Sequence, residues 1–487
     1  MRRARGALLP PIQAERVRGR DLYRALRGAV LDGTLPVGEQ LPSSRAVGRD
    51  YRVSRGMAEQ VYAQLVDEGF LERAIGRGTF VTSRVLPVRR NGARAKALPL
   101  SRRGRAAAAS AACREPEVLR PFNAGTADTR EFPWKTWQRL QARAARELGR
   151  GALDFADPRG LPTLRAAIAC YLAQFHGVAC EAGQVVVFNS SQQALLALFV
   201  LLLDRGDPVW LEDPCYLGAR AALSLAGAEI TPVPVDDHGL RVDDAVSRAP
   251  RARLAYVTPS HQYPTGAALS LERRVALIEW AVKRGAWIVE DDYDSEFRYA
   301  GQPLSPLWSL DPRARVLYLG TLSKLMFVSL RLAYLVVPEA LVEPLANLRT
   351  QLDGFTPPLA QATTALFMGE GHLATHARRM RSVYGEKRAE MIEELAPLAA
   401  QGWTWTSNAA GLHLLVRHGS GAHVRAVARA SGLSLALLSA YRSRRGSDDG
   451  LLLRYGGLDL EQVRAGAREL VAAERRASDS GRRSLGR

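Results

Sequence analysis

Cysteine, lysine and long apolar runs are all scarce in this chain of 487 residues. Its four cysteines stand apart with no C-x-x-C pair, which argues against a disulfide framework and a zinc site and favours a reducing cytoplasm. The longest apolar run, residues 194–203, is well short of the roughly 20 residues that span a bilayer. The apolar segment at residues 7–11 is too short for a signal peptide. We therefore expect a cytoplasmic globular protein that does not enter a membrane.

Residues 84–114 contain no acidic side chain, and the positive charge of the chain is concentrated in its first 114 residues. The formal net charge is +18. Residues 1–114 contain 23 basic and 9 acidic side chains, whereas the rest of the chain contains 44 and 40. A charge run is often only a solvated face, but a basic front end on a nearly neutral body is typical of nucleic-acid contact. Residues 84–118, basic and rich in Gly, Ala, Pro and Ser, predict a flexible linker whose alanine-rich part, residues 106–112, is transiently helical.

The segment before this linker has the periodicity of three helices followed by a hairpin. Apolar positions predict a helix over residues 21–31. A serine-capped short helix over residues 45–50 follows, and Ser54 caps a third helix. Two short β segments are then joined by a turn that contains two glycines. We assign residues 15–83 to a winged helix-turn-helix, whose third helix enters the major groove of DNA.

From residue 119 to about residue 474, β-type runs alternate with helical periodicity. This alternation predicts an α/β fold with a mainly parallel sheet. Polar loops follow the strands, and ligands of open α/β sheets bind at the carboxyl ends of strands. The loop after residues 185–188 leads into a helix whose first turn is a natural phosphate site. The basic tail, residues 475–487, is expected to be disordered.

Only five of the 67 basic side chains are lysines, and Lys324 lies between two strand-like runs. A buried lysine is costly unless it is paired or used covalently, and lysine, unlike arginine, can form a Schiff base. The hydroxyls of Thr321 and Ser323 and the guanidinium of Arg331 make a phosphate cradle beside that amine. A lone Ser-Lys pair is more often a solvated turn, but this spacing between two strands favours the phosphate site.

Two groups of motifs resemble known families. LPSSRAV, VSRGMAEQVYAQLVDEGFLE and GRGTFV resemble the GntR-type winged helix. NSSQQAL, EDPCY, TPSHQYPTG, EDDYDSEFRY and GTLSK stand in the order of fold-type I aminotransferases. Together they resemble the MocR-type regulators of the GntR superfamily. This resemblance implies an N-terminal winged helix-turn-helix (α+β) and a C-terminal α/β fold-type I aminotransferase-like domain that binds pyridoxal 5′-phosphate (PLP).

The resemblance also implies roles for individual residues. Lys324 would carry PLP as an internal aldimine, and the buried carboxylate of Asp291 would keep the pyridine nitrogen protonated. The other cofactor contacts would be Tyr293 at the ring hydroxyl, Tyr216 stacked on the ring, and Ser191, Gln192, Thr321, Ser323 and Arg331 around the phosphate. DNA would be faced by Arg45, Ser54, Arg55, Gly56 and Met57, with Gly76 and Arg77 at the wing. Arg55 suits a bidentate guanine contact, whereas for Arg45 and Arg49 a surface ion pair is the alternative.

Three departures from the aminotransferase pattern bear on function. Tyr263 stands where asparagine is usual, and Cys215 stands where glycine is usual. Leu452 occupies the place of the arginine that holds the substrate carboxylate, which leaves Arg454, two residues later on the same strand face, as a candidate for an effector carboxylate. The acidic residues near Asp291, namely Asp292, Asp294 and Glu296, are interpreted as a solvated turn.

The loss of the arginine that usually holds the substrate carboxylate favours ligand sensing over catalytic turnover. Our main hypothesis is a head-to-tail homodimeric regulator that binds promoter DNA and senses a small amine, an amino acid or PLP through an aldimine at Lys324. The alternative is a catalytically active PLP-dependent aminotransferase that carries a DNA-binding module. A third hypothesis, a body that has lost PLP and only dimerises, is disfavoured by the intact lysine, aspartate and tyrosine set.

Overall fold

The computed structural model describes residues 10, 12, 17–83, 99–110, 120–123, 125–301, 304–406, 408–444 and 446–485, with side chains described up to residue 479. The chain divides into two compact units between residues 99 and 100, and each unit is described by itself. Among the described helices, none combines the length and the apolar character needed to cross a bilayer.

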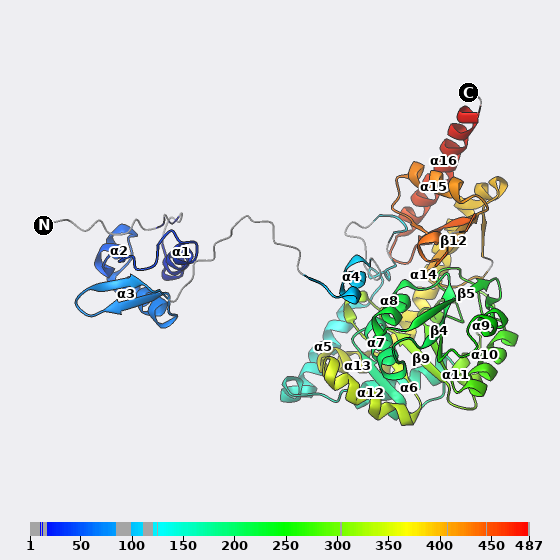
Figure 1. Ribbon diagram of the computed structural model, residues 1–487, viewed down its shortest axis with the longest axis horizontal. Helices are drawn as coiled ribbons and strands as arrows, with labels where there is room; N and C mark the ends of the chain where they lie inside the picture. Colours follow the sequence, from blue (N-terminus) through cyan, green and yellow to red (C-terminus); the bar gives the residue numbers. More distant parts are fainter. Residues whose placement is uncertain are drawn as a thin grey trace. The chain divides into compact units, whose positions relative to one another are not determined.

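The first unit is a winged helix (Figure 1). It contains α1 (Gly19–Leu31), α2 (Ser44–Asp50), α3 (Arg55–Asp67) and the hairpin of β1 (Leu71–Ala74) and β2 (Gly78–Val81). The side chain of Ser43 caps α2 by accepting from the Ala46 N–H at 3.3 Å, and Ser54 caps α3 by accepting from Met57 at 3.1 Å. These caps satisfy N–H groups that helix starts leave open, which is why both helices begin within one residue of where the sequence predicts.

The second unit is built on an eight-stranded sheet. In spatial order its strands are β3 (Val185–Phe188), β10 (Ala333–Val336), β9 (Val316–Thr321), β8 (Trp287–Asp292), β7 (Leu254–Val257), β4 (Pro208–Asp213), β5 (Glu229–Asp236) and β6 (Gly239–Leu240). Neighbours from β9 to β5 are parallel, whereas β10 is antiparallel to both β3 and β9. The prediction of a mainly parallel sheet is confirmed.

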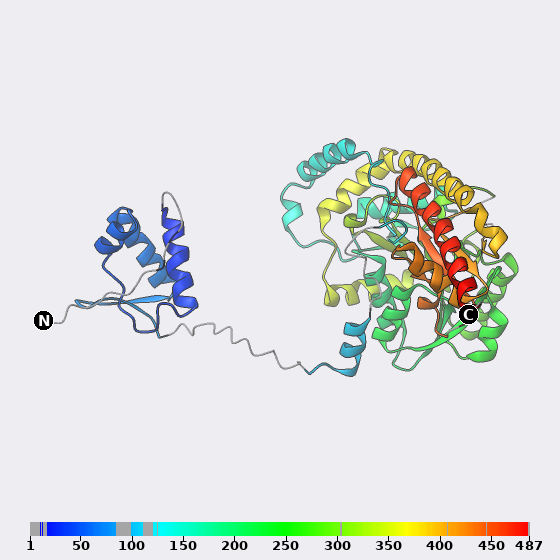
Figure 2. The same ribbon diagram turned by 90° about the horizontal axis from the view of Figure 1, so that it is seen from above.

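Helices cover both faces of this sheet (Figures 1 and 2). Alternation along β3 sends Val186 and Phe188 to one face and Val185 and Val187 to the other. The first face packs against α7 (Ser191–Leu202), α8 (Leu217–Ala226) and α12 (Glu339–Leu352). The second packs against α6 (Pro162–Phe175), α13 (Pro358–Gly369), α9 (Val242–Arg248) and α10 (Leu271–Arg284). This is the three-layer arrangement expected for alternating strands and helices.

A smaller antiparallel sheet follows in the chain, with the order β11 (Thr404–Trp405), β12 (His413–His418), β14 (Asp449–Arg454) and β13 (Ala436–Leu437). Its apolar face packs on α14 (His372–Leu395), α15 (Gly421–Ser431) and α16 (Leu460–Leu485). Helices α14 and α16 lie side by side (Figure 2). The other α-helices of the described part are α4 (Arg102–Ala109), α5 (Trp134–Leu148) and α11 (Leu307–Leu310).

Two expectations about flexible segments can be compared with the described residues, and the second needs correction. Within the expected linker, α4 is a helix capped by the Ser101 side chain, which accepts from the Gly104 N–H at 2.9 Å; residues 84–98 and 111–118 lie outside the described part. The tail expected to be disordered continues α16 to Leu485. It does so because Ala477 packs against the core and Arg476 donates to the Ala430 carbonyl at 2.9 Å, contacts that its basic composition does not indicate.

Candidate functional site

A cavity of about 310 Å³ opens at the carboxyl ends of β7, β8 and β9. Besides residues of these strands and the loops that follow them, β12 and β14 of the small sheet contribute to its wall. The structure brings together nine of the residues predicted for the cofactor and effector: Ser191, Tyr216, Asp291, Tyr293, Thr321, Ser323, Lys324, Arg331 and Arg454. Gln192 is not in this lining, and its amide donates to the Gly218 carbonyl at 2.9 Å.

Lys324 lies in the connection between β9 and β10, which are paired antiparallel. Its side chain is half-buried, and the ammonium donates to the carbonyl of Gly125. A methyl group placed on Gly125 would lie 3.5 Å from Lys324 Nζ and 3.5 Å from Arg454 Cδ. Both cationic side chains therefore lie within van der Waals distance of this backbone position. Because its contribution is a backbone carbonyl, sequence reasoning missed Gly125.

Hydroxyl groups and one guanidinium surround the lysine on the side of the α7 N-terminus. Thr321 and Ser323 are half-buried, and Arg331 is exposed with φ of 55°, a left-handed conformation that is uncommon for arginine. Ser190, missed in the sequence, caps α7 by accepting from Gln193 N–H at 3.1 Å and lines the cavity beside Ser191. Hydroxyls, an arginine and a helix N-terminus together form an anion site.

Asp291, the penultimate residue of β8, is a buried carboxylate at the floor of the cavity. Burial raises the pKa of its carboxyl to about 7, although the Tyr256 hydroxyl, which donates to Oδ2 at 2.5 Å, favours the ionised form. A cationic N–H placed beside this carboxylate would be stabilised as an ion pair in a site that excludes water. Tyr256 was missed because it lies inside the apolar run of β7.

Two aromatic rings face the cavity with fixed orientations. The ring of Tyr216 packs against Gly218, where an added methyl group would lie 2.4 Å from Tyr216 Cζ. The hydroxyl of Tyr293 donates to the carbonyl of His261 at 2.8 Å. Burial, and next the charge of Asp294, raise the pKa of Tyr293, so this phenol stays neutral. One ring offers a flat face for stacking and the other offers a phenol oxygen.

Arg454 reaches the cavity from β14 and donates to neutral oxygens. Its partners include the Asn123 carbonyl at 2.9 Å, the Tyr263 hydroxyl at 3.1 Å and the Tyr441 hydroxyl. Leu452, on the same strand face, is fully buried and packs with Tyr441. The apolar side chain at the usual arginine position is thus part of a packed cluster, while Arg454 faces the cavity.

In the first unit, the residues predicted to face DNA lie on the surface. Arg45, Ser54, Arg55, Gly56, Gly76 and Arg77 are exposed, whereas Met57 is half-buried. The tip of the wing is held by Gln40, whose side-chain amide donates to the Arg77 carbonyl at 2.7 Å. Gln40, far from the wing in sequence, was not predicted.

Two family profiles match this chain. The profile described as "Aminotransferase class I and II" matches residues 123–441, and "Bacterial regulatory proteins, gntR family" matches residues 18–81. The probable rhizopine catabolism regulatory protein MocR of Rhizobium meliloti is 36% identical over 460 residues, which cover 93% of each chain. The chain belongs to the MocR-type regulators.

Further comparisons relate this MocR-type chain to a second regulator and to an enzyme. The HTH-type pyridoxine biosynthesis transcriptional regulator PdxR of Corynebacterium glutamicum is 31% identical over 444 residues, covering 91% of this chain and 93% of PdxR. Among solved structures, LysN, an alpha-aminoadipate aminotransferase from Thermus thermophilus complexed with N-(5′-phosphopyridoxyl)-L-leucine, has a TM-score of 0.67 and 28% identity, covering 74% of this chain and 92% of LysN. The aminotransferase class I and II fold implies PLP as its cofactor, and the gntR domain implies DNA binding.

The donor set of the MocR-type cavity fits PLP by its own chemistry. The amine of Lys324 suits the aldehyde, the carboxylate of Asp291 suits the ring nitrogen, and the ring of Tyr216 suits a stacked pyridine. The hydroxyls and Arg331 near the α7 N-terminus suit the phosphate.

The acidic turn after Asp291 is buried, so its interpretation as a solvated turn is wrong. Asp294 is 2% exposed and lies 2.9 Å from His261 Nδ1. Asp292 and Glu296 lie 3.5 Å and 3.4 Å from the nitrogens of His176. Although burial opposes it, these two carboxylates raise the pKa of His176 to about 10. Histidines that are distant in sequence provide the partners that make burial possible.

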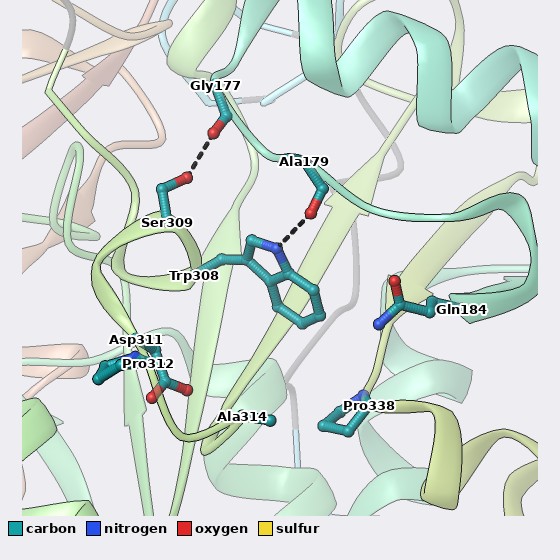
Figure 3. A pocket seen from close by; sticks show the side chains of 9 residues that line it. All are labelled: Gly177, Ala179, Gln184, Trp308, Ser309, Asp311, Pro312, Ala314 and Pro338. Carbon is teal, nitrogen blue, oxygen red and sulfur yellow. Dashed lines mark hydrogen bonds between the residues drawn. The ribbon is translucent and has the colours of Figure 1, made fainter.

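A second cavity, of about 380 Å³, lies away from Lys324 (Figure 3). Polar groups in its wall already bond one another: the Trp308 indole donates to the Ala179 carbonyl at 3.0 Å, and the Ser309 hydroxyl donates to Gly177. The wall has no amine comparable to Lys324. Apart from the two hydrogen-bonded pairs, three of its nine residues are proline or alanine, whose side chains have no polar group. It is therefore the weaker candidate for a site in this MocR-type chain.

Proposed function

We propose that this chain is a PLP-dependent transcriptional regulator, which binds promoter DNA and senses an amino compound or PLP through covalent linkage at Lys324. The proposal is carried by one observation: an amine, a buried carboxylate and an anion site line one cavity in a chain that also has a gntR domain. When bound, PLP supplies an aldehyde for the amine and a ring that withdraws electrons. A cytoplasmic location accords with this role.

The residues of the chain have separate roles in this proposal. Lys324 binds the aldehyde, Asp291 holds a proton at the ring nitrogen, and Tyr216 fixes the ring plane by stacking. The phosphate is held by Ser191, the backbone of Gln192, Thr321, Ser323 and Arg331, with Ser190 as an additional contact. Arg454 is the candidate group for an effector carboxylate, because it is the guanidinium that β14 brings to the cavity.

Sensing is favoured over turnover by the replacement of the usual substrate arginine with the buried Leu452. The second candidate function, a working aminotransferase with a DNA-binding module, is supported by the retained Lys324 and Asp291. Sustained keto-acid production from a panel of amino acids at ordinary enzyme rates, on the order of 1–1,000 per second, would favour the enzyme.

A homodimer is part of the proposal, and the surface of the second unit supports it. Leu153 and Phe155 are 85% and 96% exposed, and Val328, which also lines the cavity, is 39% exposed. Single apolar side chains are common on protein surfaces, but two that lie close in the sequence, such as Leu153 and Phe155, are a feature of contacts between chains. A two-fold dimer presents two winged helices to two half-sites of DNA. Analytical ultracentrifugation of Phe155→Asp beside wild type tests this part.

The sensing proposal is tested by DNA affinity. A fragment selected by the full-length protein from random sequences is titrated with the PLP-loaded protein, with and without each member of an amino acid panel. We expect one amine to change the affinity by about 5- to 150-fold, the range of typical allosteric coupling. Affinity that is identical with PLP and every amine present or absent refutes the sensor.

Arg55 is expected to read a base, since it is exposed at the first turn of α3. Arg55→Ala should weaken binding to the selected fragment by about 5- to 150-fold, as loss of a bidentate base contact costs ~1–3 kcal/mol. Arg24→Ala, an exposed arginine on α1, is the matched control and should change affinity little. A uniform loss on specific and random DNA would show that Arg55 contacts only phosphate.

A further inference from the structure

A buried lysine on α14, which is not among the residues that line the cavity, joins two stretches of chain that form its wall. Lys387 and Asp128 are 3% and 4% exposed. The Lys387 ammonium donates to Asp128 Oδ2 at 2.7 Å and to the Gly456 carbonyl at 3.1 Å. One ammonium group, with its three N–H donors, thus holds two different stretches together. We call the Lys387 ammonium, the Asp128 carboxylate and the Gly456 carbonyl the clamp.

The first stretch, which ends at Asp128, brings two backbone carbonyls to the cationic groups of the cavity. The Lys324 ammonium donates to the carbonyl of Gly125, and Arg454 Nη1 donates to the carbonyl of Asn123 at 2.9 Å. Both carbonyls lie only a few residues before the carboxylate that Lys387 holds. The clamp therefore fixes one end of the stretch that contacts both cations.

The second stretch runs from Arg454 to Gly457 and packs directly on the first. A methyl group added to Gly456 would lie 2.7 Å from the carbonyl oxygen of Thr126, and one added to Gly457 would lie 2.3 Å from Thr126 Oγ1. The Arg454 N–H donates to the Phe122 carbonyl at 3.3 Å. The two stretches thus touch without room for a side chain between them, and the clamp lies across this contact.

Further contacts fix the orientation of the clamp. The Asp128 N–H donates to the Tyr384 hydroxyl at 2.9 Å, and the Lys387 ammonium lies 5.1 Å from the centre of the Tyr384 ring. Arg130 Nε donates to Asp128 Oδ1 at 2.8 Å. Replacing a buried ion pair by apolar side chains is often neutral or stabilising, so stability alone does not account for a pair at this place. What the pair supplies is a fixed geometry.

We infer that Lys387 is a positioning residue, which acts through Asp128 and Gly456 to hold the Arg454 guanidinium in the direction that meets an effector carboxylate. The inference rests on the proposed function, because it requires that carboxylate in this cavity. A guanidinium whose direction is fixed before the ligand binds loses less conformational freedom on binding. Loss of the clamp should therefore weaken recognition of the carboxylate more than recognition of the rest of the ligand.

The test compares two reduced adducts of PLP on the cofactor-free, full-length protein. N-(5′-phosphopyridoxyl)glycine and N-(5′-phosphopyridoxyl)methylamine differ in the carboxylate, and neither has an aldehyde that reacts with Lys324. Isothermal titration calorimetry gives the two dissociation constants, and their ratio measures recognition of the carboxylate. We expect wild type to prefer the glycine adduct by about 10- to 150-fold, the range of a hydrogen bond to a charged group.

Lys387→Met removes the charge of the clamp and should reduce this preference by about 3- to 10-fold. The loss is partial because the Tyr263 and Tyr441 hydroxyls still accept from Arg454. A preference that Lys387→Met leaves unchanged overturns the inference. Asp128→Asn should have the same effect, and it replaces Lys387→Met if that variant does not fold.

Two further variants separate positioning from a general effect on the fold. Arg464→Met is the matched control, since Arg464 Nε donates to Glu390 Oε2 at 2.7 Å and joins α16 to the same helix as Lys387; it should leave the preference unchanged. Arg454→Met should abolish the preference, and Lys387→Met should then change it no further. If Lys387→Met lowers the ratio equally with and without Arg454, it does not act through Arg454 and the inference is overturned.

Failure of the proposed function has a different signature. A wild-type protein that binds neither adduct contradicts the proposed function, and the inference falls with it. A wild-type protein that prefers the glycine adduct, with the same preference in Lys387→Met and Asp128→Asn, contradicts the inference alone.

Discussion

Lys324→Ala is expected to abolish the visible absorbance that the purified protein acquires with PLP, while DNA binding stays measurable. The chain has only five lysines, and among those in the described part of the chain Lys324 is the one in the cavity wall, where its ammonium donates to the Gly125 carbonyl. Alanine has no amine to bind an aldehyde, so the loss should be complete and not graded. The winged helix is a separate compact unit, which is why its binding to DNA should persist.

The matched control is Lys283→Ala, an exposed lysine in the last turn of α10. It should leave the absorbance unchanged. Difference spectra on addition of PLP, followed by borohydride reduction and peptide mass analysis, locate the attachment. A Lys324→Ala protein that still becomes yellow and retains PLP covalently after reduction would show that another amine carries the cofactor.

The residues that sequence reasoning placed in the cavity have side chains with a distinctive chemistry at a fixed spacing from a strand end. Lys324, Asp291 and Arg331 are of this kind, and the β9–β10 pairing and the end of β8 bring them to one wall. The parallel order of β7, β8 and β9 follows from the alternation of strands and helices, which the sequence displays. The local periodicity of the sequence was thus sufficient to predict the alternating strands and helices of the second unit.

Contacts through the backbone or between distant segments could not be predicted in this way. The Gly125 carbonyl has no side chain to mark it, and Tyr256 differs from its apolar neighbours in β7 only by one hydroxyl. The buried acidic turn was misjudged because its partners, His176 and His261, lie outside the turn. An acidic cluster is normally solvated, and only knowledge of the tertiary contacts reverses that expectation.

Asp291→Asn is expected to make the cofactor-free protein more stable at neutral and alkaline pH, although it should impair PLP binding. Burial raises the pKa of Asp291 to about 7, well above the value of an unfolded chain. At pH values below the pKa that Asp291 has in the unfolded chain, its carboxyl is protonated in both the folded and the unfolded state. It then does not make the free energy of unfolding depend on pH. As pH rises from about 4 to 7, the unfolded state ionises first and binds fewer protons, so the free energy of unfolding falls. Above about 7 both states are ionised and the full cost, on the order of 4 kcal/mol, remains.

Asparagine carries no charge at any pH, and its side-chain oxygen can still accept from the Tyr256 hydroxyl. The stability of Asp291→Asn relative to wild type should therefore increase between about pH 4 and 7 and then stay constant. Urea unfolding of the cofactor-free proteins across this range measures it, with Asp237→Asn, at an exposed aspartate, as the control. Glu290, whose pKa burial also raises to about 7, is unchanged in both proteins and cancels in the comparison. Burial likewise raises the pKa of Glu212 to about 7 and the charge of Asp291 adds to this, so Asp291→Asn should lower the pKa of Glu212 and increase stability in the same direction.

The same substitution should weaken PLP binding, because the ring nitrogen loses the carboxylate that keeps it protonated. A gain in stability coupled to a loss of cofactor binding is the behaviour of a residue retained for function at the expense of the fold. If Asp291→Asn is instead less stable than wild type at pH 8 without cofactor, the buried carboxylate is stabilised by the protein itself. Its place at the cavity floor would then have a structural explanation, and the assignment of Asp291 to the cofactor would lose its physical basis.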